Sequence, residues 1–213
     1  MLRLSGISVS IGPVGILRSI SMEVGSGQFA GLIGRNGAGK TTLMRSIMGL
    51  LPCREGTVEL DGAVLGPVPA HRRVSLGVGY MPEDRRLVPG LTVEENVLLP
   101  AWSARLPDPA ARLARVYRAI PEVQELRARR ALELSGGQQK LVALARAMMG
   151  GTRLLLLDEP FEGVAPVLAR RLAEVIGGLR RTGLTAILSE SNLTHAHGLL
   201  DRTFVIDRGA VTA

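Results

Sequence analysis

A glycine-rich segment, Gly34-Arg35-Asn36-Gly37-Ala38-Gly39-Lys40-Thr41, constrains the fold of this chain more than any other feature. It matches the pattern G-x-x-x-x-G-K-[ST] and follows an apolar stretch, Phe29–Ile33, that we expect to be a β-strand. Glycines allow backbone N–H groups to converge on phosphate oxygens, and a helix that begins after the loop adds positive potential. The segment therefore predicts a strand, a phosphate-binding loop and a helix over about residues 39–49.

Each residue type in this loop has an expected contact with a bound nucleoside triphosphate. The Lys40 ammonium should reach the β- and γ-phosphates, and the Thr41 hydroxyl should be a ligand of Mg²⁺. The residues expected to contact the nucleotide are Gly34, Asn36, Gly37, Ala38, Gly39, Lys40, Thr41 and Thr42. A fortuitous glycine turn is the alternative, and it would need neither the strand nor the helix.

A short apolar run, Leu154 to Leu157, ends in two carboxylates, Asp158 and Glu159. Such a run is typical of a central parallel strand that is buried on both faces. The carboxyl ends of such strands are where α/β proteins bind ligands. We expect Asp158 to hold Mg²⁺ through water and Glu159 to be the general base that polarises the attacking water. Taken alone, the run is also compatible with an ordinary solvated strand end.

A second helix start, Leu134-Ser135-Gly136-Gly137-Gln138, has the composition of an anion site. Ser135 can cap the helix, and Gln138, three residues on, can bond back to it in a capping box. The two glycines leave backbone N–H groups uncovered at the helix N-terminus, which makes an anion site with no lysine of its own. A simple helix start is the alternative, and it would not need both glycines.

The order of apolar patterns predicts an α/β fold with a P-loop NTPase core, a mostly parallel sheet and an N-terminal antiparallel β portion. A capping box at residues 92–95 and the Asp108-Pro109 pair start helices in a helical insert. We interpret the chain as a single domain over residues 1–213, with a core of residues 1–81 and 135–213 and a helical subdomain of residues 82–134. Strands are expected at residues 20–24, 184–189 and 203–207, and helices at residues 166–181 and 193–200.

Composition excludes several other classes of protein. The chain has 213 residues, of which 46% are hydrophobic, so it can bury one mid-sized core. No apolar run approaches the roughly 18 residues of a membrane-spanning helix, and no signal peptide is evident. The single cysteine, Cys53, excludes an internal disulfide and a cysteine-based metal site. These features favour a cytosolic location.

The net charge of +7 comes mostly from arginine, because Lys40 and Lys140 are the only lysines. Basic proteins often bind nucleic acid or anionic lipid. Lysine is a compact point charge whereas arginine is planar and bulky, so a retained lysine can mark a place that needs an ammonium. For Lys140 we favour chance instead.

The three motifs follow one another along the chain as phosphate loop (residues 34–42), signature (134–138) and acidic strand (154–159), and in this order they resemble those of the ATP-binding cassette (ABC) family. The resemblance covers essentially the whole chain. In that family two domains face each other head to tail. Each ATP lies between the phosphate loop of one domain and the signature of the other, here Ser135, Gly136, Gly137 and Gln138. The resemblance therefore implies ATP and Mg²⁺, hydrolysis with Lys40 and Glu159 at the catalytic centre, and a second nucleotide-binding subunit, identical or homologous.

The family also implies partners at a membrane. We expect membrane-spanning permease subunits, an indirect link to a periplasmic or extracellular substrate-binding protein, and a peripheral place on the cytoplasmic face of the cell membrane. Residues 77–86, 91–96 and 162–166 look like the importer ATPases for branched-chain amino acids, and related subunits serve urea and other amides. Residues 85–91 and Trp102 mix basic and apolar groups, which suits a groove for permease helices; a solvated loop is the alternative.

Three positions depart from the usual family pattern. Ile11 stands where an aromatic side chain usually stacks on adenine, which predicts weak discrimination among purine nucleotides. Glu83 stands where a glutamine usually lies near Mg²⁺, with a solvent-facing side chain as the alternative. Ser191 stands where a histidine usually contacts the γ-phosphate, which predicts slow hydrolysis that depends heavily on Glu159. The nearby histidines are interpreted as surface or packing residues.

Two other functions stay open at this point. One is a cassette that binds ATP but hydrolyses it poorly; the missing aromatic and histidine favour it, while Lys40, Asp158 and Glu159 oppose it. The other is a cassette ATPase that acts on nucleic acid. Such proteins carry long coiled coils, and no sustained heptad run exists here, so no nucleic-acid partner is expected.

Overall fold

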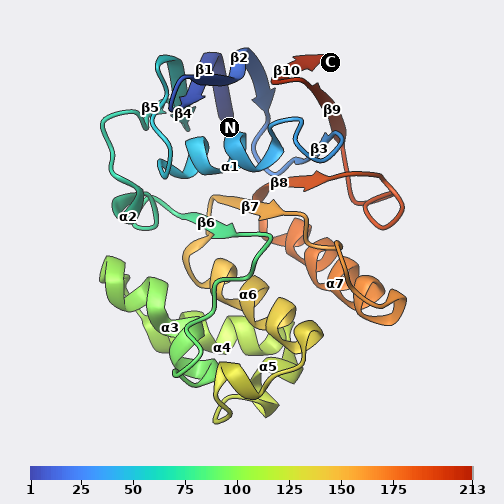
Figure 1. The fold of residues 1–213 in the computed structure, drawn as a ribbon. Helices are drawn as coiled ribbons and strands as arrows, with labels where there is room; N and C mark the ends of the chain where they lie inside the picture. Colours follow the sequence, from blue (N-terminus) through green and yellow to red (C-terminus); the bar gives the residue numbers. More distant parts are fainter. Residues whose placement is uncertain (213) are drawn as a thin grey trace.

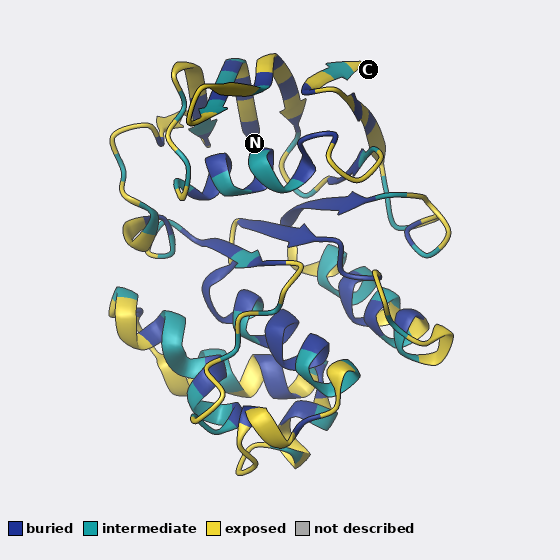
Figure 2. Cartoon of the chain, viewed as in Figure 1, coloured by how far each residue is buried: buried dark blue, intermediate teal, exposed yellow. Residues whose placement is uncertain are grey.

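The parallel sheet predicted from the sequence is the centre of the computed structural model, which describes residues 1–212. Within these residues the sheet has six strands in the order β10-β9-β3-β8-β7-β6, parallel except for β10 against β9. All residues of β7 and β8 are buried (Figure 2), as expected of central strands covered on both faces. The strands are β3 (Phe29–Ile33), β6 (Val78–Met81), β7 (Leu154–Asp158), β8 (Thr185–Glu190), β9 (Arg202–Asp207) and β10 (Ala210–Thr212).

A second, antiparallel sheet confirms the expected N-terminal β portion. Its strands lie in the order β2-β1-β4-β5 and are β1 (Leu2–Ile11), β2 (Val14–Val24), β4 (Glu55–Leu60) and β5 (Ala63–Val64). Helix α1 (Lys40–Met48) lies between the two sheets (Figure 1). Its Met44 and Ile47 belong to a core shared with Leu4 of β1 and Leu156 of β7. The helix that follows the phosphate loop is therefore fixed by packing from both sides.

The helical segment forms the end of the molecule opposite the antiparallel sheet (Figure 1). It packs on α6, and one core joins Val97, Leu144 and Leu155 of α3, α6 and β7. Within residues 1–212, no helix has both the length and the apolarity required to cross a membrane. The helices are α2 (Ala70–Arg73), α3 (Val93–Ala104), α4 (Pro109–Ala119), α5 (Pro121–Glu125), α6 (Gly136–Gly150) and α7 (Pro166–Leu179), with 3₁₀ turns η1 (Ala131–Glu133) and η2 (Arg180–Thr182).

The predicted capping box before α3 is present. The Thr92 hydroxyl accepts from the Glu95 N–H at 3.2 Å, and the Thr92 N–H donates to the Glu95 carboxylate at 2.7 Å. Helix α4 begins at Pro109, the predicted first helical position. Both helix starts depend on residues within one helical turn of each other, which is why they could be predicted from the sequence.

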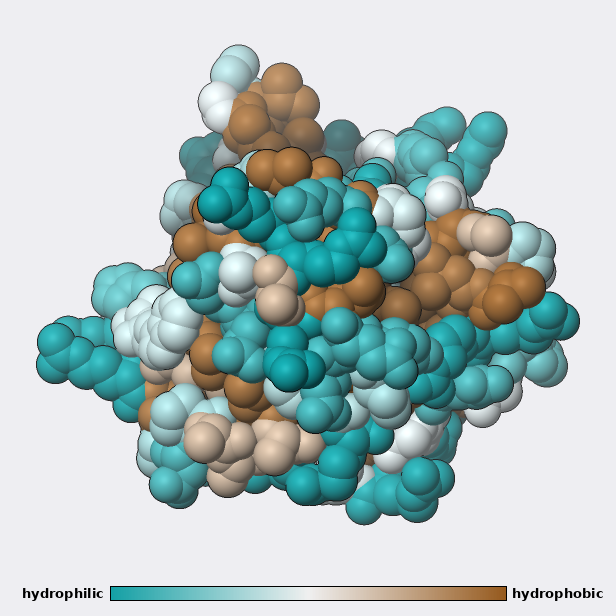
Figure 3. Space-filling view, turned by 90° about the horizontal axis from the view of Figure 1, so that it is seen from below, coloured by the Kyte–Doolittle hydropathy of each residue, from teal (hydrophilic) through white to brown (hydrophobic). Residues whose placement is uncertain are grey.

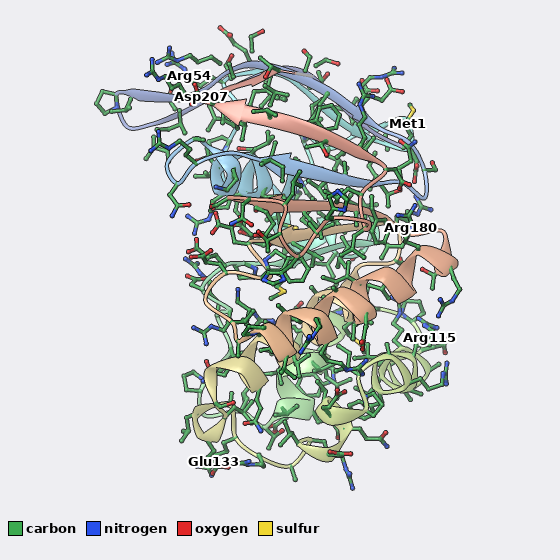
Figure 4. All side chains as sticks on the ribbon, turned by 90° about the vertical axis from the view of Figure 1, so that its right-hand side faces the viewer. Met1, Arg54, Arg115, Glu133, Arg180 and Asp207 are labelled. Carbon is green, nitrogen blue, oxygen red and sulfur yellow. The ribbon has the colours of Figure 1, made fainter. Side chains whose placement is uncertain are left out.

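Charged side chains occur on more than one face of the molecule. Viewed from the helical end, the surface is mostly hydrophilic, with separate hydrophobic patches (Figure 3). Arg54 lies at the end formed by the antiparallel sheet, whereas Arg115 and Glu133 lie on the helical part (Figure 4). The positive charge is therefore not gathered at one end.

Two local predictions were wrong. Residues 193–200 form turns rather than a helix. The N–H groups of Ala196 and Leu199 bond to carbonyls three residues back, and Gly198 has a φ of 87°, a left-handed conformation that ends any helical run. So short a segment has little helical stability of its own. Strand β2 begins at Val14, earlier than the predicted residue 20, because its first half pairs with the end of β1.

Candidate functional site

The phosphate loop connects β3 to α1, and its glycines are where the backbone requires them. Gly37 and Gly39 have φ of 81° and 114°, in the region that glycine occupies without a steric penalty. A Cβ at Gly34 would clash with the carbonyl oxygen of Ile206 in β9. A cavity of about 390 Å³ lies at the loop, lined by Ile16, Asn36, Gly37, Gly39, Lys40, Thr41, Thr42, Glu83 and Glu159. Residues from the loop, β2, β7 and the end of β6 thus meet at one place.

Lys40 is buried at the centre of this cavity's wall, 3% exposed. Its ammonium donates to the carbonyl oxygens of Gly34 at 2.5 Å and Arg35 at 3.2 Å. It also lies 3.0 Å from a carboxylate oxygen of Glu159, in an ion pair that is nearly free of solvent. A triphosphate bound in the loop would compete for this ammonium, and binding would therefore change the contacts of Glu159.

Asp158 is oriented by three hydroxyl groups. Its Oδ1 accepts from Ser189 at 2.7 Å and from Thr41 at 3.2 Å, and its Oδ2 accepts from Tyr80 at 3.2 Å. Burial raises the pKa of the Asp158 carboxyl, the three hydrogen bonds lower it, and the charge of Glu159 raises it. The carboxylate is therefore fixed in direction by its neighbours.

The Thr41 and Asp158 oxygens fit a magnesium ion. Mg²⁺ prefers hard oxygen ligands and is usually held by one or two carboxylates together with substrate phosphates and water. No group of three or more histidine, cysteine or acidic residues in residues 1–212 forms a closed metal cage. A single carboxylate beside a hydroxyl and a phosphate loop is the donor set of a Mg²⁺–nucleotide site, so the residues present fit this ion.

Glu159 has a backbone conformation that is uncommon for its type, with a φ of 47°. Its N–H donates to both the carbonyl and the hydroxyl of Ser189, each at 3.1 Å. Its carboxylate contacts Lys40 and the hydroxyl of Ser191, the latter at 3.5 Å. The side chain is 5% exposed. Held in this way, the carboxylate reaches the phosphate loop, where a general base would be needed.

Glu83 follows β6 and lines the same cavity, although its side chain is exposed overall. Partial burial raises the pKa of its carboxyl, and the charges of Glu159 and Asp158 raise it further. Glu83 thus lines the same cavity as Thr41 and Glu159. The side chain is exposed, as in the solvent-facing alternative, and a contact with Mg²⁺ stays a prediction.

Ser191 joins the phosphate loop to the acidic strand. Its hydroxyl donates to the Asn36 side-chain oxygen at 2.8 Å and accepts from Lys40 at 3.3 Å. The structure therefore brings Ser191, Asn36, Lys40 and Glu159 together. Ser191 therefore lies beside the phosphate loop, and its contact with a γ-phosphate stays a prediction.

Ile11 is placed differently from Ile16. Ile11 lies at the end of β1, beside the turn to β2, and is 51% exposed. It is not among the residues that line the loop cavity, whereas Ile16 of β2 is. Sequence analysis did not identify Ile16, because β2 was expected to begin after it.

The signature segment starts α6 with the predicted capping box. The Ser135 hydroxyl accepts from the Gln138 N–H at 3.3 Å, and the Ser135 N–H donates to the Gln138 side chain at 3.0 Å. This segment does not line the loop cavity. It lines a separate cavity of about 740 Å³ whose walls are Glu83, Asp84, Arg85, Ser135, Gly136, Gly137, Gln138, Lys140, Leu141, Glu162, Gly163, Val164, Ala165 and Leu168. One chain thus presents the two motifs at two different places.

Besides Ile16, sequence reasoning missed three functional candidates: Tyr80, Ser189 and Glu190. Ser189 lies directly opposite Asp158 in the parallel pairing of β8 with β7. The polar residues at the end of an apolar strand could have signalled this, since neighbouring parallel strands end at the same edge. Tyr80 gave no such signal, because the side that its hydroxyl faces depends on the sheet order.

Comparison with known proteins identifies the family. The sequence model of the ABC transporter family matches residues 17–162. The high-affinity branched-chain amino acid transport ATP-binding protein BraG of Pseudomonas aeruginosa is 35% identical over 211 residues, which cover 99% of this chain and 91% of BraG. The lipopolysaccharide export system ATP-binding protein LptB of Haemophilus influenzae is 30% identical, over 93% of this chain and 83% of LptB.

Solved structures of the same family share the fold. The ADP conformation of MJ1267, an ATP-binding cassette of an ABC transporter, superposes with a TM-score of 0.85 at 28% identity and covers all of this chain and 89% of that one. The dimeric structure of the cassette MJ0796 has a TM-score of 0.88 and covers all of this chain and 97% of the MJ0796 chain. Its sequence is 22% identical, so this likeness supports the fold and nothing more. Together with the phosphate loop and the signature helix, these matches show that the chain belongs to the ABC transporter family and is one of its ATP-binding ATPase subunits.

Proposed function

We propose that this chain hydrolyses ATP as one half of a head-to-tail pair and drives an importer of branched-chain amino acids or related amides. The observation that carries the pairing is the separation of the two motifs into different cavities. Lys40, Thr41, Asp158 and Glu159 meet at one cavity, and the signature lines the other. Because each chain offers two unlike halves, a second cassette in the reverse orientation would complete both.

The residues around the loop cavity have separable roles in this proposal. The Lys40 ammonium holds the phosphate that is transferred, and Glu159, 3.0 Å from Lys40, accepts a proton from the attacking water. Ser191 fixes the Asn36 side chain beside the loop and contacts both Lys40 and Glu159. Mg²⁺ held at Thr41 and Asp158 would neutralise the charge that develops on the phosphate oxygens.

Replacing Glu159 with glutamine tests the pairing and the general base together. Glutamine keeps the size of the side chain and cannot accept the proton, so phosphate release should fall by about 10²–10⁴-fold. ATP should stay bound, and light scattering should then detect an ATP-dependent dimer. Glu174→Gln, a change at a largely exposed carboxylate on α7, is the matched control and should leave hydrolysis unchanged. A variant that stays monomeric with ATP would contradict the proposed pair.

A groove of about 330 Å³ between α1, β6, α3 and α6 is the proposed docking place for a permease helix. Its walls include Met48, Leu50, Val74, Tyr80, Pro82 and Pro100, and its charged groups are Arg45, Arg86 and Arg146. Apolar walls with arginines suit a helix end, whose C-terminal carbonyls are partly negative. Of the residues expected to form this surface, Arg86 lines the groove, whereas Trp102 is exposed and does not. The proposed location is therefore the cytoplasmic face of the membrane, bound through this groove.

The groove is connected to the signature by hydrogen bonds. Arg146 donates to the carbonyls of Arg85 and Arg86, and the Arg85 guanidinium donates to the carbonyl of Gly136 at 3.2 Å. Charge reversal, Arg86→Glu, should therefore reduce transport in vesicles that contain the permease while ATP affinity stays unchanged. Arg54→Glu, at the end of the molecule formed by the antiparallel sheet and outside the lining of the groove, is the control. Loss of ATP affinity in Arg86→Glu would contradict the assignment of the groove.

The direction and substrate of transport come from similarity. BraG, which covers nearly the whole chain, is named for branched-chain amino acid transport, and LptB is named for lipopolysaccharide export. The higher identity and coverage of BraG support import. Vesicles carrying this chain, its permease subunits and an external substrate-binding protein should accumulate labelled branched-chain amino acids when ATP is inside. Accumulation that does not need the binding protein, or movement outward, would contradict the importer proposal.

A poorly hydrolysing cassette is the second candidate, and Ser191 is the observation that favours it. The serine hydroxyl reaches Lys40 and Glu159 but carries no charge for the γ-phosphate. Phosphate release by the purified chain, measured with and without the permease, distinguishes the hydrolysing ATPase from the poorly hydrolysing cassette. Tight ATP binding without turnover in both cases would support this candidate.

A further inference from the structure

We propose that Lys140, on the helix that begins with the signature, is a positioning residue that holds the backbone of Glu159. Through this contact, binding of the partner's nucleotide at the signature is transmitted to hydrolysis of the chain's own nucleotide. The inference rests on the proposed head-to-tail pair. Lys140 lies five residues after Ser135, in the first turns of α6. The helix whose first turn meets the partner's nucleotide in this arrangement therefore carries, on its next turn, the ammonium that contacts the backbone of Glu159.

The contacts of Lys140 are short and buried. Its ammonium donates to the carbonyl oxygen of Glu159 at 2.6 Å and to that of Glu162 at 2.9 Å. The side chain is 4% exposed. Residues 159–162 form a turn in which the Glu162 N–H donates to the Glu159 carbonyl at 3.2 Å. Lys140 thus binds both ends of the turn that begins with the general base.

This turn needs support because Glu159 has a left-handed backbone conformation. Its N–H is held by Ser189, and its carbonyl is held by Lys140. Because Pro160 has no N–H, the next N–H along the chain is that of Phe161, and it donates to the Glu190 carboxylate at 3.1 Å. With its N–H and its carbonyl both fixed, the backbone of Glu159 aims the carboxylate at Lys40.

The chemistry at this position explains why a lysine is kept. Lys140 is one of two lysines among 26 basic residues, and the other, Lys40, is in the phosphate loop. Burial lowers the pKa of the Lys140 ammonium, while the charges of Glu190, Glu162 and Glu83 favour its protonated form and that of Arg85 opposes it. An ammonium offers three donors in a small volume, whereas a guanidinium is planar and larger. A space between two carbonyls in a buried turn fits the smaller group.

The position of Lys140 connects two functions that belong to different nucleotides. In a head-to-tail pair the signature of a chain serves the ATP of its partner, while its Glu159 serves its own. The signature cavity is lined both by residues 135–138 and by the segment after Glu159, from Glu162 to Leu168. When the signature binds the partner's nucleotide, Lys140 holds residues 159–162 in place. The two sites then hydrolyse ATP together.

The test compares Lys140→Met, Lys140→Gln and Arg73→Met in the full chain. Methionine keeps much of the volume and removes the donors, whereas glutamine keeps two donors without the charge. Arg73 is the matched control: it is equally buried and donates to the carbonyls of Ser46, Ile47, Leu65 and Val68, away from the loop cavity. Each variant is measured for kcat, KM for ATP, the Hill coefficient and thermal stability.

The expected result is a split between kcat and KM. Lys140→Met should lower kcat at least tenfold, keep KM within threefold and reduce the Hill coefficient from near 2 to near 1. Lys140→Gln should recover part of the lost kcat. Arg73→Met should lower thermal stability while kcat per folded molecule stays within twofold. If Lys140→Met fails to fold, the same kcat, KM and Hill measurements on Lys140→Gln decide the question.

Two results would overturn the inference while leaving the proposed function intact. One is an active, ATP-dimerising wild type whose Lys140→Met variant keeps its kcat and Hill coefficient. The other is a Lys140→Met variant in which activity falls only as the folded fraction falls, as in Arg73→Met. A wild type that neither dimerises with ATP nor releases phosphate would instead refute the proposed function, and the role of Lys140 would fall with it.

Discussion

Glu190 places a carboxyl group where ionisation is unfavourable, and its replacement by glutamine should change how stability depends on pH. The side chain ends β8, is 5% exposed and accepts the Phe161 N–H. Burial raises its pKa from 4.5 to about 7. The charges of Glu159 and Glu162 act in the same direction, while the Phe161 N–H and the Lys140 ammonium act against it.

The size of the effect follows from the difference in pKa between the folded and unfolded states. Each unit corresponds to about 1.4 kcal/mol, so a rise from 4.5 to about 7 amounts to roughly 3 kcal/mol. Between these pH values the folded chain keeps the proton and the unfolded chain has released it. The wild type therefore loses stability as the pH rises from about 4.5 to about 7 and stays at the lower value above that.

Glutamine keeps the oxygen that accepts from Phe161 and has no proton to lose. Glu190→Gln should match the wild type near pH 4.5 and be more stable by roughly 3 kcal/mol at pH 8. Urea unfolding followed by circular dichroism, without nucleotide, measures the difference at pH 4.5, 6 and 8. Glu174→Gln, at an exposed carboxylate, should show no such trend. A variant that is no more stable than the wild type at pH 8, or a difference independent of pH, would refute the reasoning.

Three further changes test single contacts. Ser191→Ala removes the hydroxyl between Asn36 and Glu159, and we expect the rate of phosphate release to fall several-fold at unchanged ATP affinity; an unchanged rate would count against a role for Ser191. Gly34→Ala introduces a methyl group against the Ile206 carbonyl, and loss of stability or of ATP binding by about 1–3 kcal/mol should be visible in melting with and without ATP. Tyr80→Phe removes the hydroxyl that holds Asp158, and the Mg²⁺ concentration for half-maximal hydrolysis should rise about tenfold. Tyr117→Phe, which removes a similar bond to Glu94, should leave the Mg²⁺ dependence unchanged.

The elements that could be predicted are those whose signals lie within a few residues of each other. The phosphate loop, the capping boxes at Thr92 and Ser135 and the buried run of β7 each depend on neighbours within one turn or one strand. Such signals survive folding because tertiary packing reinforces them. Residues 193–200 show the limit: the apolar spacing allowed a helix, but Gly198 and the short length favoured turns.

The contacts of the site could not be predicted in the same way because they join distant parts of the chain. Tyr80 lies 78 residues from Asp158, and Lys140 lies 19 residues from Glu159. Whether such side chains meet depends on sheet order and helix packing, which no local pattern specifies. The family resemblance placed Lys40, Asp158 and Glu159 in one site, but it did not indicate which residues orient them. That is why Lys140 was attributed to chance.

The two carboxylates that end β7 are each held by a residue that also belongs to a different partner-facing cavity. Asp158 accepts from Tyr80, which lines the groove proposed for a permease helix. Glu159 is held through its carbonyl by Lys140, which lines the cavity of the signature. A shift in either cavity would therefore reach one of two adjacent residues, Asp158 at the end of β7 and Glu159 directly after it. In the proposed mechanism hydrolysis needs both carboxylates, so we expect turnover to depend on the permease and on the second cassette at once.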